Sequence, residues 1–77
     1  MTPEQVADAI ANPRKGDVWQ KDGGQAELTF TPTHYSFCFQ WEGPANSAPP
    51  IVSWNEDWRP PFRAWCRTAT LVKRGEA

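Results

Sequence analysis

The sequence lacks long hydrophobic runs. Nowhere do roughly 18 apolar residues follow one another, and no apolar signal-peptide core stands at the N-terminus. The chain also has only two cysteines, with no CxxC pattern. These absences argue against a membrane protein or a secreted disulfide scaffold. We therefore expect a cytoplasmic protein whose thiols stay reduced.

Reactive side chains are equally scarce, because the chain has one histidine and two cysteines. His34 and Cys38 share one face of an expected strand, roughly 13 Å apart by its rise, which is too far for a single tetrahedral ion. Cys66 is expected on a buried helix stripe, away from both. The sequence therefore predicts no metal site, no cofactor and no catalytic residues, and indicates that the protein is not an enzyme.

What the chain does have is turn-forming and aromatic residues. Its 77 residues include eight prolines, five glycines, five tryptophans, four phenylalanines and one tyrosine. This length allows one domain, and the many enforced turns favour a sheet over a helical bundle. We predict an α+β fold over residues 1–77: a small antiparallel sheet of three to five strands, with an N-terminal helix and a short C-terminal helix packed on it.

The first helix is expected over residues 2–12. Thr2 is a suitable cap, Pro3 suits the first helical position, and Gln5 completes a capping box. The apolar side chains expected along its face are Val6, Ala7, Ile10 and Ala11. Docking on the domain and docking on a partner both remain open for this helix.

The sheet is expected between residues 17 and 54. Strands over 17–21 and 25–31 meet at the glycine-rich turn 22–24, and in the second strand Ala26, Leu28 and Phe30 share one face. A further strand covers 34–41. Its two faces alternate, with Tyr35, Phe37, Phe39 and Trp41 toward the core and His34, Ser36, Cys38 and Gln40 away from it. Residues 42–50 read as a proline-rich loop, and 51–54 as a possible short strand.

The stretch 54–68, WNEDWRPPFRAWCRT, predicts a turn followed by a helix over 60–68. Asn55, Glu56 and Asp57 offer capping oxygens, and the double proline delays the helix start. The expected buried stripe is Phe62, Trp65, Cys66 and Ala69. A last strand follows over 70–73.

Arginines recur every fourth residue along this helix. Arg59, Arg63 and Arg67 fall on one face, turned away from the buried stripe. Although the net charge is −1, no acidic residue interrupts the segment from Arg59 to Arg74. Tryptophan and arginine are enriched at binding hot spots, so we predict that the three arginines and Trp58 form a partner-binding surface for an acidic protein. A solvated face, paired to Glu56 or Glu42, is the alternative.

GDVW (16–19), Gly23-Gly24 before a strand, and FRAWCRTATLV (62–72) resemble the layout of small phage and prophage orphan proteins. The resemblance implies a phage-encoded accessory protein acting in the bacterial cytoplasm, one that binds and inhibits a host complex such as RNA polymerase or a CRISPR effector. Two other hypotheses remain: a small nucleic-acid-binding β domain and a structural or assembly protein. The sequence leaves the oligomeric state open.

Overall fold

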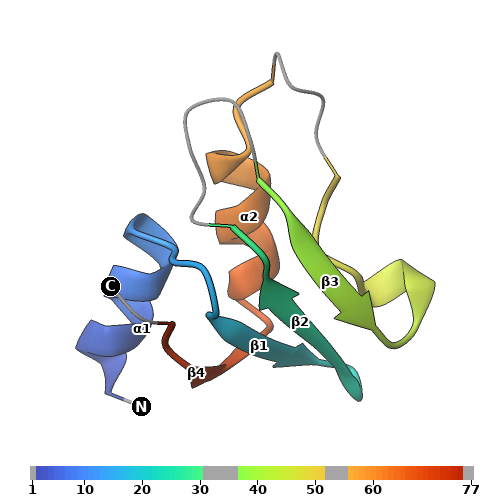
Figure 1. Ribbon diagram of the computed structural model, residues 1–77, viewed down its shortest axis with the longest axis horizontal. Coiled ribbons are helices and arrows are strands. Elements are labelled where there is room, and N and C mark those ends of the chain that lie inside the picture. The colour runs from blue at the N-terminus through green and yellow to red at the C-terminus, as the bar shows by residue number, and fades with distance from the viewer. Residues whose placement is uncertain (1, 31–36, 52–55, 76–77) are drawn as a thin grey trace.

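The computed structural model describes residues 2–30, 37–51 and 56–75 (Figure 1). Its elements are α1 (Pro3–Ala11), β1 (Val18–Lys21), β2 (Gly24–Leu28), β3 (Phe39–Glu42), the 3-10 helix η1 (Ala45–Ser47), α2 (Arg59–Cys66) and β4 (Thr70–Lys73). The predicted α+β class is confirmed. Within the described residues, no helix is long and apolar enough to cross a membrane.

Helix α1 begins at the predicted capping box. The Thr2 hydroxyl accepts the Gln5 N–H at 3.2 Å, and the Gln5 side-chain oxygen accepts the Thr2 N–H at 2.9 Å. The buried side chain is Ala9, with the flanking apolar residues half-buried. The prediction that Ala7 and Ala11 share this face is wrong. Both are exposed, because each is two residues from the buried Ala9 and so lies about 200° from it around the helix axis. The helix docks on the domain.

Strands β1 and β2 form a tight hairpin. Lys21 pairs with Gly24, which leaves Asp22 and Gly23 as a two-residue turn with φ of 51° and 82°. Positive φ at both positions is typical of the type I′ turn that matches strand twist. Strand β2 ends at Leu28, short of residue 31, so the predicted alternation stops there and Phe30 is 60% exposed. The predicted burial of Phe30 is therefore wrong.

The four strands form one antiparallel sheet in the order β3-β2-β1-β4. The predicted strand over 34–41 is shorter in the structure, and residues 34–36 lie outside the described residues. Of the predicted strand over 51–54, residues 52–54 also lie outside the described residues. Ile51 is not in a strand and is 90% exposed. β4 has the predicted bounds.

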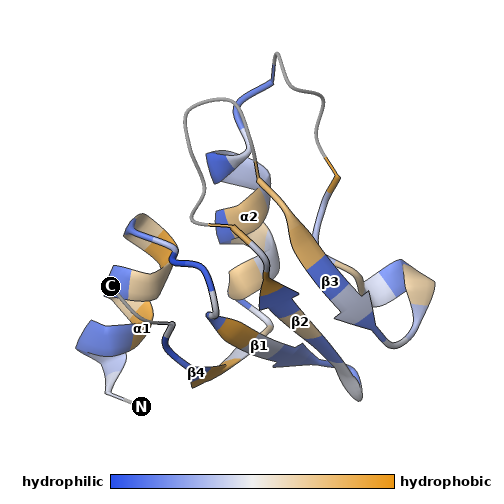
Figure 2. Ribbon diagram, viewed as in Figure 1, coloured by the Kyte–Doolittle hydropathy of each residue, from blue (hydrophilic) through white to orange (hydrophobic). Residues whose placement is uncertain are grey.

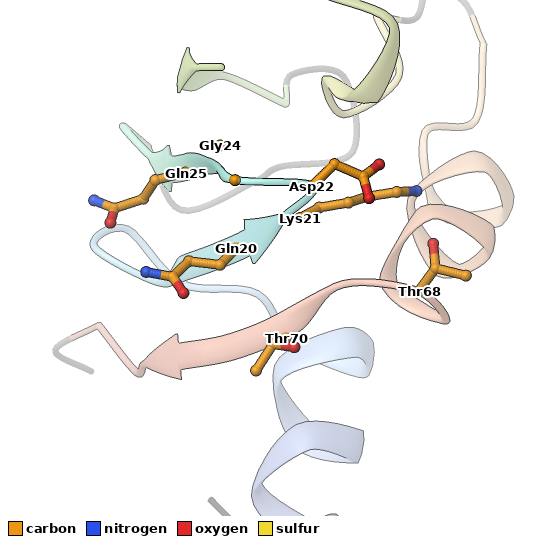
Figure 3. Close-up of a pocket in the computed structure, with 8 residues that line it drawn as sticks. Gln20, Lys21, Asp22, Gly24, Gln25, Thr68 and Thr70 are labelled. Carbon is orange, nitrogen blue, oxygen red and sulfur yellow. The ribbon is translucent and has the colours of Figure 1, made fainter. Parts of the chain in front are cut away.

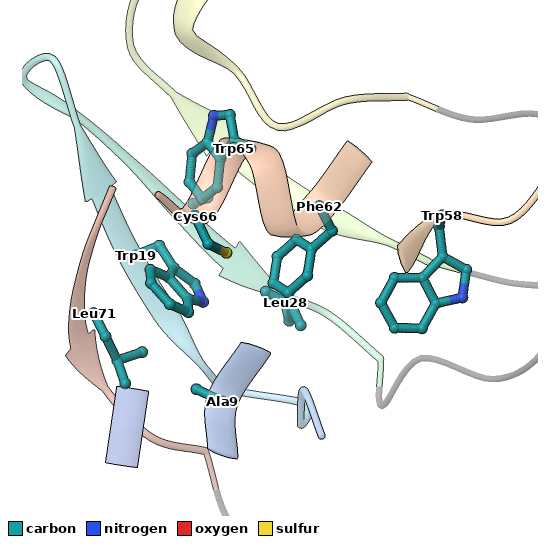
Figure 4. Close-up of a cluster of buried hydrophobic side chains, with 9 residues drawn as sticks. Ala9, Trp19, Leu28, Trp58, Phe62, Trp65, Cys66 and Leu71 are labelled. Atoms are coloured by element: carbon teal, nitrogen blue, oxygen red, sulfur yellow. The ribbon is translucent and has the colours of Figure 1, made fainter. Parts of the chain in front are cut away.

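Both helices cover the same face of the sheet, and the core lies between the two layers (Figure 4). Along β2, hydrophobic and hydrophilic residues alternate, as an antiparallel sheet with one covered face requires (Figure 2). The buried core side chains are Ala9, Trp19, Ala26, Leu28, Trp58, Phe62, Trp65, Cys66 and Leu71. Trp19 is at the centre, with its ring edge-on to Phe62 at 6.1 Å and to Trp65 at 6.3 Å. The core thus fixes how α2 sits on the sheet.

Candidate interaction surface on helix α2

The N-cap residue of helix α2 is Trp58, which makes no side-chain cap hydrogen bond, and Asp57 stands just before it. The Asp57 carboxylate accepts the backbone N–H of Arg59 at 3.0 Å. Pro60 and Pro61 follow in the first turn. Backbone N–H groups there have no acceptor within the helix, so prolines, which lack the N–H, cost no hydrogen bond. The helix was predicted over 60–68. It starts at Arg59, just before the predicted start, and ends at Cys66, before the predicted end, because the chain tightens into a turn there. In that turn the N–H of Thr68 reaches only back to the Trp65 carbonyl.

The inward face of α2 carries the predicted stripe. Phe62, Trp65 and Cys66 are all buried. The indole N–H of Trp65 donates to the carbonyl of Ser47 at 2.8 Å, and the Lys21 ammonium lies 5.5 Å from the Trp65 ring centroid. The hydrogen bond ties the proline-rich loop to the helix. This link was missed in the sequence, where a serine among prolines carries no signal for it.

The outward face carries the three arginines, all exposed as predicted. Arg59 is held by Asp57, with 2.9 Å between its Nε and the Asp57 Oδ1. Arg63 and Arg67 make no ion pair and no side-chain hydrogen bond with any residue of the described segments. The surface therefore has one anchored guanidinium and two that are open to a partner.

Trp58 does not belong to this outward surface, and the prediction that it faces outward is wrong. Its ring is 7% exposed and stacks on Phe37, with centroids 5.1 Å apart and planes within 7°. It also meets Phe62 edge-on at 5.9 Å. Trp58 lies one helical turn before Phe62, so its side chain falls on the inward face. It is part of the core.

Arg74, at the end of the basic segment, is also withdrawn from the surface. Its Nη1 donates to the Asp17 carboxylate at 2.6 Å, and its Nη2 donates to Asp8 at 2.8 Å and to the Asn12 carbonyl at 3.1 Å. Asp17 is fully buried and also accepts the backbone N–H groups of Arg14 and Gly75. This cluster joins α1 to the end of β4. A lone aspartate before an apolar strand was the one signal for it in the sequence.

The two cysteines are free thiols, and burial raises the pKa of the Cys66 thiol from 9.0 to about 12, against a smaller lowering by Lys21. A neutral, buried thiol is a poor nucleophile. In the described segments, no three His, Cys, Asp or Glu side chains are placed to hold a metal ion.

A hollow of about 390 Å³ opens beside the β1–β2 turn (Figure 3). Polar side chains line it, among them Gln20, Gln25, Thr68 and Thr70. Its charged groups are engaged elsewhere: Asp22 accepts the Ser47 hydroxyl at 2.7 Å, and Lys21 lies against the Trp65 ring. The hollow therefore offers hydrogen-bonding groups without a nucleophile paired to a base.

The free guanidiniums of α2 are thus the clearest chemical feature on the described surface. No family model, curated protein or solved structure matches this chain. The surface has to be interpreted from its own residues.

Proposed function

We propose that this chain is a non-enzymatic protein-binding module, and that the outward face of α2 contacts an acidic surface on its partner. The observation that carries the proposal is the exposure of Arg63 and Arg67 without a side-chain partner among the described residues. Each guanidinium presents a planar fork of donors that fits a carboxylate with two parallel hydrogen bonds.

The packing of α2 supports this use. Phe62 and Trp65 anchor the helix in the core, so the arginines project from a fixed backbone. Beside the arginines, Pro60 and Ala64 are also exposed. A preorganised scaffold loses less conformational entropy on binding. The row of like charges also speeds encounter with an acidic partner.

The resemblance of the sequence to small phage and prophage proteins supports, as part of this proposal, a partner in a bacterial host. RNA polymerase and a CRISPR effector complex are the two targets that it suggests, and binding there would inhibit the complex. The role does not require catalytic groups, because an inhibitor of this kind acts by occupying a surface.

Nucleic-acid binding is less well supported by the described side chains. Single-stranded nucleic acid is held by aromatic side chains for base stacking and by cations for phosphate. Here the strand aromatics Trp19 and Trp41 lie on the covered face, while the exposed face of the sheet carries Glu27 and Glu42. Carboxylates repel phosphate.

The proposal is tested by affinity capture from bacterial lysate. The wild-type chain is compared with Arg63→Glu/Arg67→Glu, with Lys73→Glu as a control that reverses an exposed charge on β4. We expect a discrete protein to be retained by the wild type and the control and lost by the double variant. If the same protein binds all three, or none is retained, the proposal fails.

A further inference from the structure

The sheet face opposite the helices is uncovered by any described element. Strand pairing places its outward residues in two rows across the sheet, since directly paired residues share a face. One row runs Glu42, Gln25, Gln20 and Thr70, and the other runs Gln40, Glu27, Val18 and Lys73. All of these are exposed except Val18. The face is therefore hydrophilic, with carboxylates concentrated at the β2–β3 side.

Glu27 and Glu42 form no ion pair with any described residue. Together with Gln25 and Gln40 they line a hollow of about 110 Å³. Glu27 pairs with Gln40, so Glu42 is its diagonal neighbour on β3, about 7–8 Å away by the usual spacing. The two exposed carboxylates thus form a neighbouring pair of acceptors.

The same chain carries matching donors on its other layer. Arg63 in α2 and Arg67, the C-cap residue of that helix, are four residues apart, about 6 Å along the helix axis. This spacing is close to that of the carboxylate pair, and the length of the arginine side chains covers the difference. Because α2 packs on the opposite face of the sheet, the two charged surfaces of one molecule point in opposite directions. They cannot meet within one chain.

We propose that a second copy of this chain docks Arg63 and Arg67 on Glu27 and Glu42, in a head-to-tail contact. The two faces have opposite charges, and neither has a partner within the described chain. A second copy of the chain therefore supplies the matching charge for each face. Such a contact joins different surfaces of the two copies, so each pair still has one free surface of each kind and adds further copies as concentration rises. Exposed ion pairs dominate the contact, so salt weakens it.

This self-association does not depend on the proposed function, because it requires only the purified chain. It has a consequence for that function, since each head-to-tail contact covers the arginines that would bind a host protein. Only the copy at one end of such an assembly then has its arginines exposed.

The test measures molar mass by light scattering after size exclusion, over a range of protein concentrations at low and high salt. Two variants are compared with the wild type: Arg63→Glu/Arg67→Glu reverses the helix surface, and Glu27→Lys/Glu42→Lys reverses the sheet surface. We expect the mass of the wild type to rise above 8.7 kDa with concentration at low salt and to return to it at high salt. Each variant alone should remain monomeric.

Mixing the two variants provides the decisive arm, because each supplies the surface that the other has reversed. We expect the mixture to regain the mass that each variant has lost. A wild type that stays monomeric at low salt overturns the inference. So does association that survives in either variant, as pairing through the edges of β3 or β4 would. Circular dichroism checks that both variants fold. If the sheet variant does not, Glu27→Gln/Glu42→Gln replaces it. This variant should be monomeric alone and should form only a one-to-one pair with the helix variant, because its own sheet face is neutral.

Discussion

Replacing Arg74 with alanine would leave the Asp17 carboxylate fully buried without its cation. The guanidinium of Arg74 lies 2.6 Å from Asp17 and is itself mostly buried, at 14% exposure. Removing one partner of a buried ion pair costs about 3–5 kcal/mol, because the remaining charge stays desolvated. The contact of Arg74 with Asp8 adds little, since that carboxylate is half-exposed. A domain of this length has a stability of roughly 4–12 kcal/mol. The change therefore removes a large part of it.

Urea denaturation followed by tryptophan fluorescence measures this loss, with Lys73→Ala as the control at an adjacent exposed position. The coupling is isolated by a double-mutant cycle with Asp17→Ala. If the pair acts as a unit, the double variant is less destabilised than the sum of the single variants by about 1–3 kcal/mol. A loss below about 1 kcal/mol for Arg74→Ala, or strictly additive effects, would refute the role assigned to this cluster.

Three further changes test the core and the hairpin. Trp65→Ala is expected to cost about 3–5 kcal/mol in thermal or urea unfolding, since it empties a buried indole site; a melt close to wild type would contradict its placement. Gly24→Ala places a Cβ in overlap with the Trp41 ring, so we expect about 1–3 kcal/mol of destabilisation, whereas an unchanged midpoint would contradict the close packing of Trp41 on Gly24. The pKa of Cys66, raised to about 12, means that the unfolded chain loses the thiol proton near pH 9 while the folded chain keeps it. Stability should therefore fall as pH rises from 9 to 12, and Cys66→Ala should remove that slope; an equal slope in the variant would contradict the buried, neutral thiol.

Local patterns were enough to predict most elements. The capping box of α1, the glycine turn of the hairpin and the bounds of β4 all depend on neighbouring residues, and the structure has them as predicted. Helical spacing also assigned Phe62 and Arg63 correctly to opposite faces of α2. These are cases in which the spacing of a few adjacent residues decides the conformation.

The errors concern contacts between distant segments. Trp58 was expected on the surface because it adjoins the arginines in sequence. Its ring instead stacks on Phe37, which is distant in the sequence. Arg74 was counted with the basic segment, although it closes an ion pair with Asp17, 57 residues away. No local pattern encodes the pairing of Arg74 with Asp17. The helical spacing of Trp58 from Phe62 did point to the inward face, but the predicted helix began only at residue 60. The candidate surface therefore keeps its arginines and loses Trp58.

The central claim, that α2 binds a partner protein through its free arginines, is tested most directly by the affinity of the captured protein for the purified chain. Isothermal titration would compare the wild type with Arg63→Glu/Arg67→Glu and Arg63→Lys/Arg67→Lys. We predict at least a tenfold weakening on charge reversal, about 1.4 kcal/mol or more, and a smaller loss for the lysine variant, which keeps the charge without the fork. An affinity unchanged by charge reversal would contradict the claim.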